Sequence, residues 1–223
     1  ITYASKRAHA IFQTDESRGE GLGTSIFDWV APNDRPLARQ QAARTTTGRE
    51  STPNIYEFIR KDGAHFFGEV SSAVLRGLNG EITGIIATIR DISQRKKDES
   101  LQEALYQISE AAYSTDSLED LYARIHAILG TLMHAENFFI ANYDAKTETI
   151  YFPYFVDAYD EKPAPRKPGR TLTDYVLRTG QPILAYPMHF EHLRETGEVV
   201  SQGTASVDWM GVPLRYKGES LGI

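Results

Sequence analysis

A long run without glycine or proline separates two halves of the sequence, and it constrains the fold more than any other feature. Residues 91–113 are rich in Gln, Lys, Glu and Leu, and they predict one continuous helix. Apolar side chains recur in it at spacings of four, three and four, at Leu101, Leu105, Ile108 and Ala112. Because this is the spacing of a coiled-coil seam, we expect the helix to pair with its copy in a homodimer; a passive spacer is the alternative.

The half before this helix predicts a sheet accompanied by helices. Asp62-Gly63 and Asn79-Gly80 have the composition of hairpin turns between apolar runs. We therefore expect three strands, at residues 55–60, 64–75 and 81–92. Helices are expected at residues 5–12 and 35–44, the second capped by Asp34 and stopped by Gly48.

The half after the helix repeats this mixture of elements. An amphipathic helix is expected at residues 118–132, beginning with a capping box formed by Ser117 and Asp120. Strands are expected at residues 138–143, 149–156, 182–186 and 209–216, and short helices at residues 171–178 and 189–195. The predicted fold class is α+β, with two domains in series, each a central antiparallel sheet flanked by helices, joined by a helical linker.

Composition excludes several kinds of site and partner. The formal net charge is -6 and there is no basic cluster, so we expect neither a nucleic-acid partner nor membrane contact. The chain has no cysteine, which rules out disulfides, thiolate metal sites and covalently attached flavin or bilin on these residues. No apolar run reaches the ~18–20 residues of a membrane span, and we expect a cytoplasmic location.

No catalytic motif is recognisable, so we expect that the chain is not itself an enzyme. It lacks a nucleophile elbow, a phosphate-binding loop and a paired-carboxylate motif. His189 and His192 lie three residues apart near Glu191 and Glu195, but their spacing is not that of a zinc-binding helix and no third ligand can be identified. We interpret them as residues of a surface helix and predict no metal site.

Several segments of the first half follow the pattern of one family of sensory domains. Residues 27–35 (FDWVAPNDR) contain a Pro-x-Asp-Arg motif, residues 56–63 (YEFIRKDG) a strand and turn, and residues 84–96 (GIIATIRDISQRK) a closing strand that leads into a helix. With residues 1–4 (ITYA), these segments resemble the PAS domain. The resemblance implies a PAS-like domain over residues 1–93, whose first strand belongs before Ile1, and a signalling helix over residues 94–113.

The second half resembles the GAF domain. The matching segments are residues 137–144 (NFFIANYD), 153–157 (PYFVD), 169–182 (GRTLTDYVLRTGQP) and 206–214 (SVDWMGVPL). The resemblance implies a GAF-like domain over residues 114–223 without the last strand and closing helix of the family. We therefore expect the sequence to be part of a longer protein.

Aromatic side chains are the candidates for ligand binding, and the identity of any cofactor stays open. The resemblances imply a small-molecule pocket over one face of a sheet. Its candidate lining residues are Trp29, Phe58 and Phe66 in the first half and Phe138, Tyr143, Phe155, Tyr175 and Trp209 in the second. Core packing is the usual role of such side chains and is the alternative for each.

The predicted function is that of a non-catalytic sensory module that transmits ligand or partner binding through the linker helix. The family patterns are common in sensor histidine kinases of two-component phosphorelay systems, so the resemblance implies such a kinase as the parent protein. The alternatives are the regulatory region of a diguanylate cyclase or phosphodiesterase, and a PAS–GAF scaffold that binds only protein.

Overall fold

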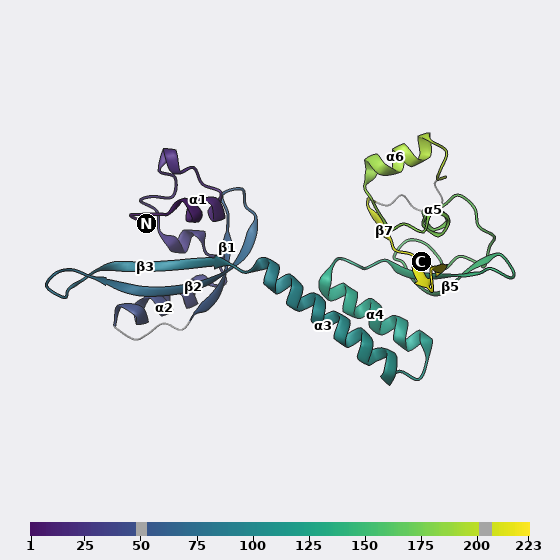
Figure 1. Ribbon diagram of the computed structural model, residues 1–223, viewed down its shortest axis with the longest axis horizontal. Helices are drawn as coiled ribbons and strands as arrows, with labels where there is room; N and C mark the ends of the chain where they lie inside the picture. Colours follow the sequence, from purple (N-terminus) through teal and green to yellow (C-terminus); the bar gives the residue numbers. More distant parts are fainter. Residues whose placement is uncertain (48–52, 201–206) are drawn as a thin grey trace. The chain divides into compact units, whose positions relative to one another are not determined.

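The computed structural model describes residues 1–47, 53–200 and 207–223, and it contains two compact units (Figure 1). The first comprises Ile1–Ser100 and the second Leu101–Ile223. Both combine helices with antiparallel strands, which confirms the α+β class. Within the described ranges, no helix is both long and apolar enough to cross a membrane.

The sheet of the first unit has three antiparallel strands in the order β1-β2-β3. They are β1 Asn54–Ile59, β2 His65–Arg76 and β3 Ile82–Asp91. Both predicted turns are present, and Gly63 and Gly80 have φ angles of 86° and 83°, a region that glycine enters without strain. The three predicted strands and their hairpin turns are therefore confirmed.

Two α-helices and two 3₁₀ turns come before this sheet in the chain. They are α1 Lys6–Phe12, η1 Glu16–Arg18, η2 Ile26–Trp29 and α2 Arg35–Thr46. Both predicted helices are confirmed, and Asp34 stands at the N-cap position of the second, as predicted. Asp34 makes no capping hydrogen bond; its Oδ2 accepts one from the Glu57 amide at 2.7 Å, which joins the start of α2 to β1. The predicted stop at Gly48 lies outside the described residues.

The core of the first unit lies between one face of the sheet and these helices. Alternation along β2 directs Phe66 and Ser72 to the same face. Phe66 contacts Phe12 of α1 with ring centroids 5.4 Å apart, and Ser72 Oγ lies 3.0 Å from Thr45 Oγ1 of α2. Both helices therefore pack on this face.

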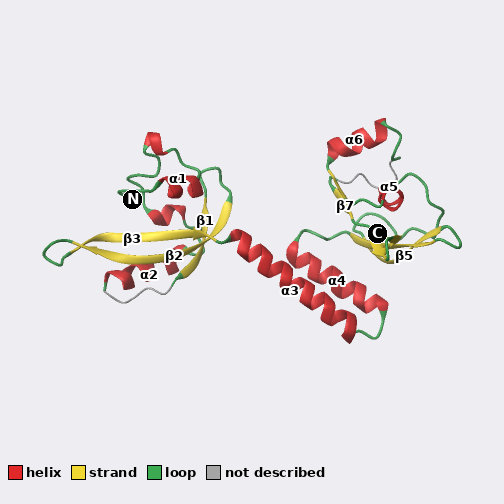
Figure 2. Ribbon diagram, in the orientation of Figure 1, coloured by secondary structure: helices red, strands yellow, loops and turns green. Residues whose placement is uncertain are grey.

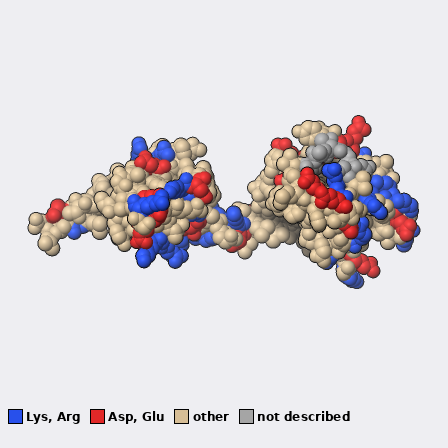
Figure 3. Space-filling model, turned by 90° about the horizontal axis from the view of Figure 1, so that it is seen from above, with Lys and Arg blue, Asp and Glu red and all other residues tan. Residues whose placement is uncertain are grey.

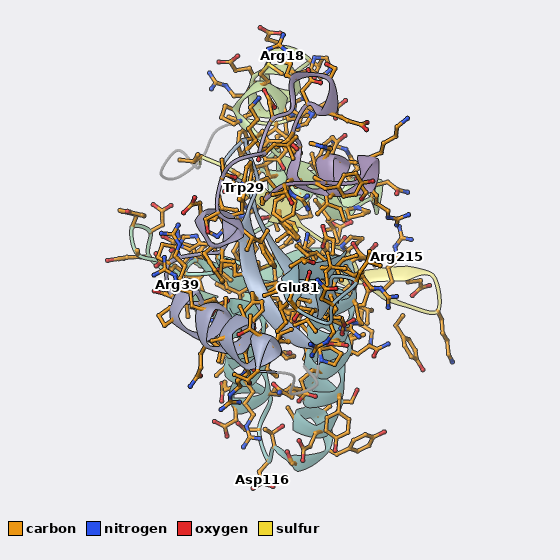
Figure 4. All side chains as sticks on the ribbon, turned by 90° about the vertical axis from the view of Figure 1, so that its left-hand side faces the viewer. Arg18, Trp29, Arg39, Glu81, Asp116 and Arg215 are labelled. Carbon is orange, nitrogen blue, oxygen red and sulfur yellow. The ribbon has the colours of Figure 1, made fainter. Side chains whose placement is uncertain are left out.

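The predicted long helix is confirmed as α3 Ser93–Ser114, and α4 Leu118–Leu132 follows it. Figures 1 and 4 show the two helices side by side and antiparallel. Ser117 Oγ accepts the Asp120 amide at 3.1 Å, so the predicted cap is present. The Asp120 carboxylate accepts the Ser117 hydroxyl rather than its amide, so only half of the predicted capping box forms.

The second unit has a four-stranded sheet in the order β5-β4-β9-β8 and a separate β6-β7 pair (Figure 2). The strands are β4 Phe138–Asp144, β5 Thr149–Val156, β6 Ile183–Ala185, β7 Trp209–Gly211, β8 Leu214–Tyr216 and β9 Glu219–Gly222, and the helices are α5 Leu172–Thr179 and α6 Pro187–Glu195. The single strand predicted for residues 209–216 is wrong, because β7 and β8 belong to different sheets. Pro213 between them has no N–H to continue a ladder.

A bulge in β5 decides which side chains share a face of this sheet. The register shifts between Ile140 and Asn142 of β4, so that β5 carries one extra residue there. Phe152 and Phe155 consequently lie on the same face, although an odd spacing normally places two residues on opposite faces.

The two faces of the β4–β5 hairpin therefore have different neighbours. One carries Phe139, Phe152 and Phe155 and packs against Leu177 of α5. The other carries Tyr154 and packs against α4. The sheet thus separates an aromatic cluster from the helical hairpin.

Candidate functional site

Four aromatic rings form the centre of the first unit. Phe12 makes edge contacts with three other rings, at centroid distances of 5.3, 5.6 and 5.4 Å. They belong to Trp29, Phe58 and Phe66, the three residues that the sequence predicts for a pocket in this half. Phe58 and Phe66 stack at 5.3 Å and are each 2% exposed. The structure thus brings the predicted residues together around Phe12, which the sequence analysis missed.

Glycine at position 68 makes room for this cluster. A Cβ atom on Gly68 would lie 2.6 Å from the Phe58 ring and 3.0 Å from Ile89. These separations are shorter than van der Waals contact, so the close stacking of the rings requires glycine here.

Arg60 connects the ring cluster to the end of β3. Its guanidinium lies over the Phe66 ring, with Cζ 4.2 Å from the centroid, and it donates to the Ile11 carbonyl of α1. The same group donates to Asp91 Oδ2 at 2.5 Å. One side chain therefore contacts α1, β2 and the last residue of β3.

Asp91 lies where the sheet ends and α3 begins. Its Oδ1 accepts the Ser93 amide at 2.9 Å, and Ser93 Oγ accepts the Phe67 amide at 3.0 Å. Ile92 between them is 3% exposed. Burial opposes ionisation of Asp91, but hydrogen bonds from Ser93 and Arg60 outweigh it and lower the pKa of the carboxyl. The charged form of Asp91 is therefore favoured at the start of the helix.

Side chains also hold the first turn of α3 on β2. Arg95 Nη2 donates to Glu69 Oε1 at 3.0 Å, and Lys96 Nζ lies 5.2 Å from the centroid of the Phe67 ring. Phe67 and Glu69 point to the opposite side of β2 from Phe66. Contacts from both faces of the sheet therefore converge on the beginning of α3.

The structure divides the residues predicted for a pocket in the second unit into separate groups. Phe155 and Trp209 both approach Phe139, at centroid distances of 6.0 and 6.4 Å, on the face toward α5. Phe138 lies on the other face, where its ring stacks on His126 of α4 at 4.9 Å. Phe138 therefore does not share a surface with Phe155 and Trp209.

Tyr143 packs against the same buried cluster as Phe155. Tyr175 on α5 lies beside Arg178, whose Cζ is 5.5 Å from the ring centroid. The sequence analysis missed Phe139, which the cross-strand pairing with Phe155 identifies once the register is known. Ligand binding by these residues stays a prediction.

An ion pair fixes the loop before α5. Arg166 Nη1 donates to Asp174 Oδ1 at 2.8 Å and Nη2 to Thr171 Oγ1 at 3.0 Å. Asp174 is 2% exposed. Burial opposes its charge, but hydrogen bonds from Arg166 and Thr171 outweigh this and lower the pKa of the carboxyl. The pair therefore contributes to the fold of this loop.

The seam predicted on α3 is exposed or half-buried within one chain. Its members are Leu101 (52% exposed), Leu105 (57% exposed), Ile108 (half-buried) and Ala112 (exposed). On the neighbouring side of the helix, Ala104 and Ala111 are 4% and 3% exposed. One stripe of α3 is thus buried within the chain, while the predicted seam beside it stays accessible.

The two histidines considered as metal ligands, His189 and His192, lie on α6. In the part of the chain that the structure describes, no three His, Asp or Glu side chains come together in a way that would hold a metal ion. On the face shown in Figure 3, acidic and basic side chains are interspersed on both units.

Comparisons with known proteins assign the first unit. The family model of the PAS domain matches residues 1–94. None of the curated proteins matches the chain. Solved structures that match part of the chain include a light-oxygen-voltage domain studied with a flavin analogue, which is 23% identical, with 46% of this chain and 75% of that chain covered and a TM-score of 0.38.

Two further similar structures come from bacteria. A PAS domain from Colwellia psychrerythraea is 16% identical, with coverage of 40% of this chain and 74% of that chain and a TM-score of 0.37. A sensory box histidine kinase/response regulator from Burkholderia thailandensis is 19% identical, with coverage of 47% and 77% and a TM-score of 0.37. TM-scores this low do not establish a shared fold, so the assignment of the first unit depends on the family model. Residues 1–94 of this chain therefore belong to the PAS domain family.

Proposed function

We propose that the chain is a non-catalytic sensory module of a signal-transduction protein, in which the PAS domain passes a change in its core to helix α3. The contact between Arg60 and Asp91 carries this proposal. Arg60 lies on the Phe66 ring of the core, and Asp91 accepts the Ser93 amide in the first turn of α3. A displacement of the rings would therefore move a group that fixes the start of the helix.

Dimerisation through α3 is part of the proposal. A helix that transmits a signal needs a partner whose packing can change, and the accessible seam of α3 provides an apolar surface for a second copy of the chain. Leu101 and Leu105 are each more than half exposed in one chain. Burial of such leucines between two chains is favourable by roughly 1.5–3 kcal/mol each.

Sedimentation of the purified chain tests the dimer. Leu105→Asp places a charge in the seam and should weaken self-association by ~100-fold, since burial of an unpaired charge costs several kcal/mol. Gln107→Asp is the matched control, because Gln107 lies on the far side of α3, where its amide contacts only the exposed Glu103. A wild-type chain that stays monomeric at high concentration would exclude transmission through a dimer.

The second unit is proposed to be a GAF-like domain, and the parent a sensor histidine kinase of a two-component system in the cytoplasm. The segments that resemble the GAF domain fall on β4 and β5 of the four-stranded sheet, on α5, which packs on that sheet, and on β7 of the separate strand pair. The regulatory region of a diguanylate cyclase or phosphodiesterase is the alternative. The amino-acid sequence that follows Ile223 in the parent distinguishes them, because a phospho-accepting histidine box identifies the kinase and a Gly-Gly-Asp-Glu-Phe motif the cyclase.

A protein-binding scaffold is a second candidate function, favoured by the packing of the first unit. Phe58 and Phe66 are almost fully buried and contact each other directly, so a ligand among these rings would have to displace them. Native mass spectrometry and an absorbance spectrum of the purified chain discriminate between the two functions. A small molecule that copurifies counts against a pure scaffold, whereas an empty protein leaves the scaffold standing.

A further inference from the structure

A polar contact holds α4 on the sheet of the second unit. His126 of α4 stacks on Phe138 with 19° between the ring planes and meets Tyr154 edge-on at a centroid distance of 5.7 Å. Its Nδ1 lies 3.0 Å from Tyr154 Oη, and its Nε2 lies 2.5 Å from the Ala135 carbonyl oxygen. One imidazole therefore contacts β4, β5 and the loop that follows α4.

The partners of His126 define its tautomer. A carbonyl oxygen only accepts hydrogen bonds, so Nε2 carries the proton and donates it to Ala135. In the neutral ring Nδ1 is then an acceptor, and the Tyr154 hydroxyl donates to it. The neighbouring loop contributes the titratable pair His134 and Glu136, with Nε2 and Oε1 3.4 Å apart and both side chains largely exposed.

The aromatic cluster lies on the opposite face, directly behind this contact. Phe155 follows Tyr154 in β5, and Phe139 follows Phe138 in β4. Adjacent residues of a strand point to opposite faces, so each strand places one ring toward α4 and the next toward α5. The rings of Phe139 and Phe155 stack at 6.0 Å. A displacement of these rings therefore acts on the backbone that carries Tyr154 and Phe138.

We propose that the hydrogen bond between His126 and Tyr154 couples the aromatic cluster of the second unit to helix α4 through the sheet. His126 and Tyr154 are positioning residues in this role, because neither touches the cluster itself. The proposal rests on the proposed sensory function. It makes the aromatic cluster of the second unit a second place from which a signal can reach the α3–α4 hairpin.

Hydrogen–deuterium exchange of the 223-residue chain tests the coupling. We would compare the wild type with Phe155→Leu, Tyr154→Phe and the double variant, and measure exchange over residues 118–132. Phe155→Leu should speed exchange in α4, and this effect should fall by about threefold or more when Tyr154 has already lost its hydroxyl, since neighbours in one network are not additive. Simple additivity, or an α4 unaffected by Phe155→Leu, would overturn the proposal.

Tyr151→Phe is the matched control. Tyr151 also lies on β5, but its hydroxyl accepts only from Asn142 Nδ2 at 3.3 Å, so its loss should leave the effect of Phe155→Leu unchanged. For the neutral His126 ring, nitrogen NMR should place the proton on Nε2; a proton on Nδ1 would disprove the hydrogen-bond assignment. Neither measurement depends on self-association, so a monomeric chain would refute the proposed dimer without deciding the coupling.

Discussion

Loss of the Arg60–Asp91 contact should destabilise the PAS domain by an amount that the structure allows us to estimate. Hydrogen bonds between charged groups contribute about 1.5–3 kcal/mol, and solvent screening reduces this value. The two side chains are 17% and 30% exposed, so we expect Asp91→Asn to cost about 1.5 kcal/mol. Asparagine retains the oxygen that accepts the Ser93 amide. Asp91→Ala removes this hydrogen bond as well and should cost about 1 kcal/mol more.

The two tryptophans of the chain permit a measurement on one unit at a time. In a Trp209→Phe background, Trp29 is the single tryptophan, and its fluorescence during urea unfolding reports on the first unit. Arg18, labelled at the top of Figure 4, has a side chain that is 76% exposed, and its ion pair with Asp15 lies at the surface of the first unit. Arg18→Gln is therefore the control, with an expected change near zero.

A thermodynamic cycle separates the contact from other effects of the substitutions. Arg60→Gln combined with Asp91→Asn should cost about 1 kcal/mol less than the sum of the single changes, because each single change already breaks the shared contact. If the costs add, or if Asp91→Asn is as harmless as Arg18→Gln, the structural role assigned to the pair is wrong.

The contribution of the Arg60–Asp91 pair to the stability of the first unit should depend on pH in a defined direction. The pKa of Asp91 is lower in the folded chain than its usual value, so its contribution to stability is present above about pH 4 and declines as the pH falls through the folded pKa. The difference in unfolding free energy between the wild type and Asp91→Asn should therefore be full at pH 7 and shrink in acid. A difference that stays constant down to pH 2 would contradict this reasoning.

Two further substitutions have clear expected outcomes. Gly68→Ala introduces a Cβ atom against Phe58 and Ile89 and should lower the stability of the first unit by about 1–3 kcal/mol in the Trp29 assay. Asp174→Asn leaves Arg166 without its buried partner and should lower the stability of the second unit by about 3 kcal/mol at pH 7. Urea unfolding followed by Trp209 fluorescence in a Trp29→Phe background measures this loss. The loss should become smaller in acid, because the pKa of Asp174 is lowered in the folded chain.

Local signals in the sequence predicted the elements of the first unit well. Asp62-Gly63 and Asn79-Gly80 fixed the hairpins because few other dipeptides enter these turns without strain. The absence of glycine and proline over residues 91–113 predicted α3 for the same kind of local reason. In contrast, Asp34 has the chemistry of a helix cap, but tertiary structure places the Glu57 amide of β1 within its reach, and this contact prevails.

The candidate site was less accessible from sequence because it depends on which face each residue occupies. Phe138 and Phe155 appear equivalent in an aromatic-rich segment, yet the register places them on opposite sides of the sheet. Alternation alone does not reveal the extra residue in β5, although Pro153 within the strand is typical of an edge strand or a bulge. Arg60 was missed for a related reason: the family motif marks it as part of a strand and turn, and only the fold brings Asp91, thirty-one residues later, to its guanidinium.

A polar contact holds each helix of the α3–α4 pair on a sheet, and this arrangement is compatible with transmission between well-packed domains. Asp91 fixes the first turn of α3, and His126 attaches α4 to the neighbouring sheet. Packed rings resist gradual deformation, whereas a hydrogen bond weakens steeply once its atoms separate by a few tenths of an ångström. A small shift of the rings can therefore make or break one contact completely. The proposed transmission thus needs two discrete arrangements of a helix end, and not a large cavity or a large domain motion.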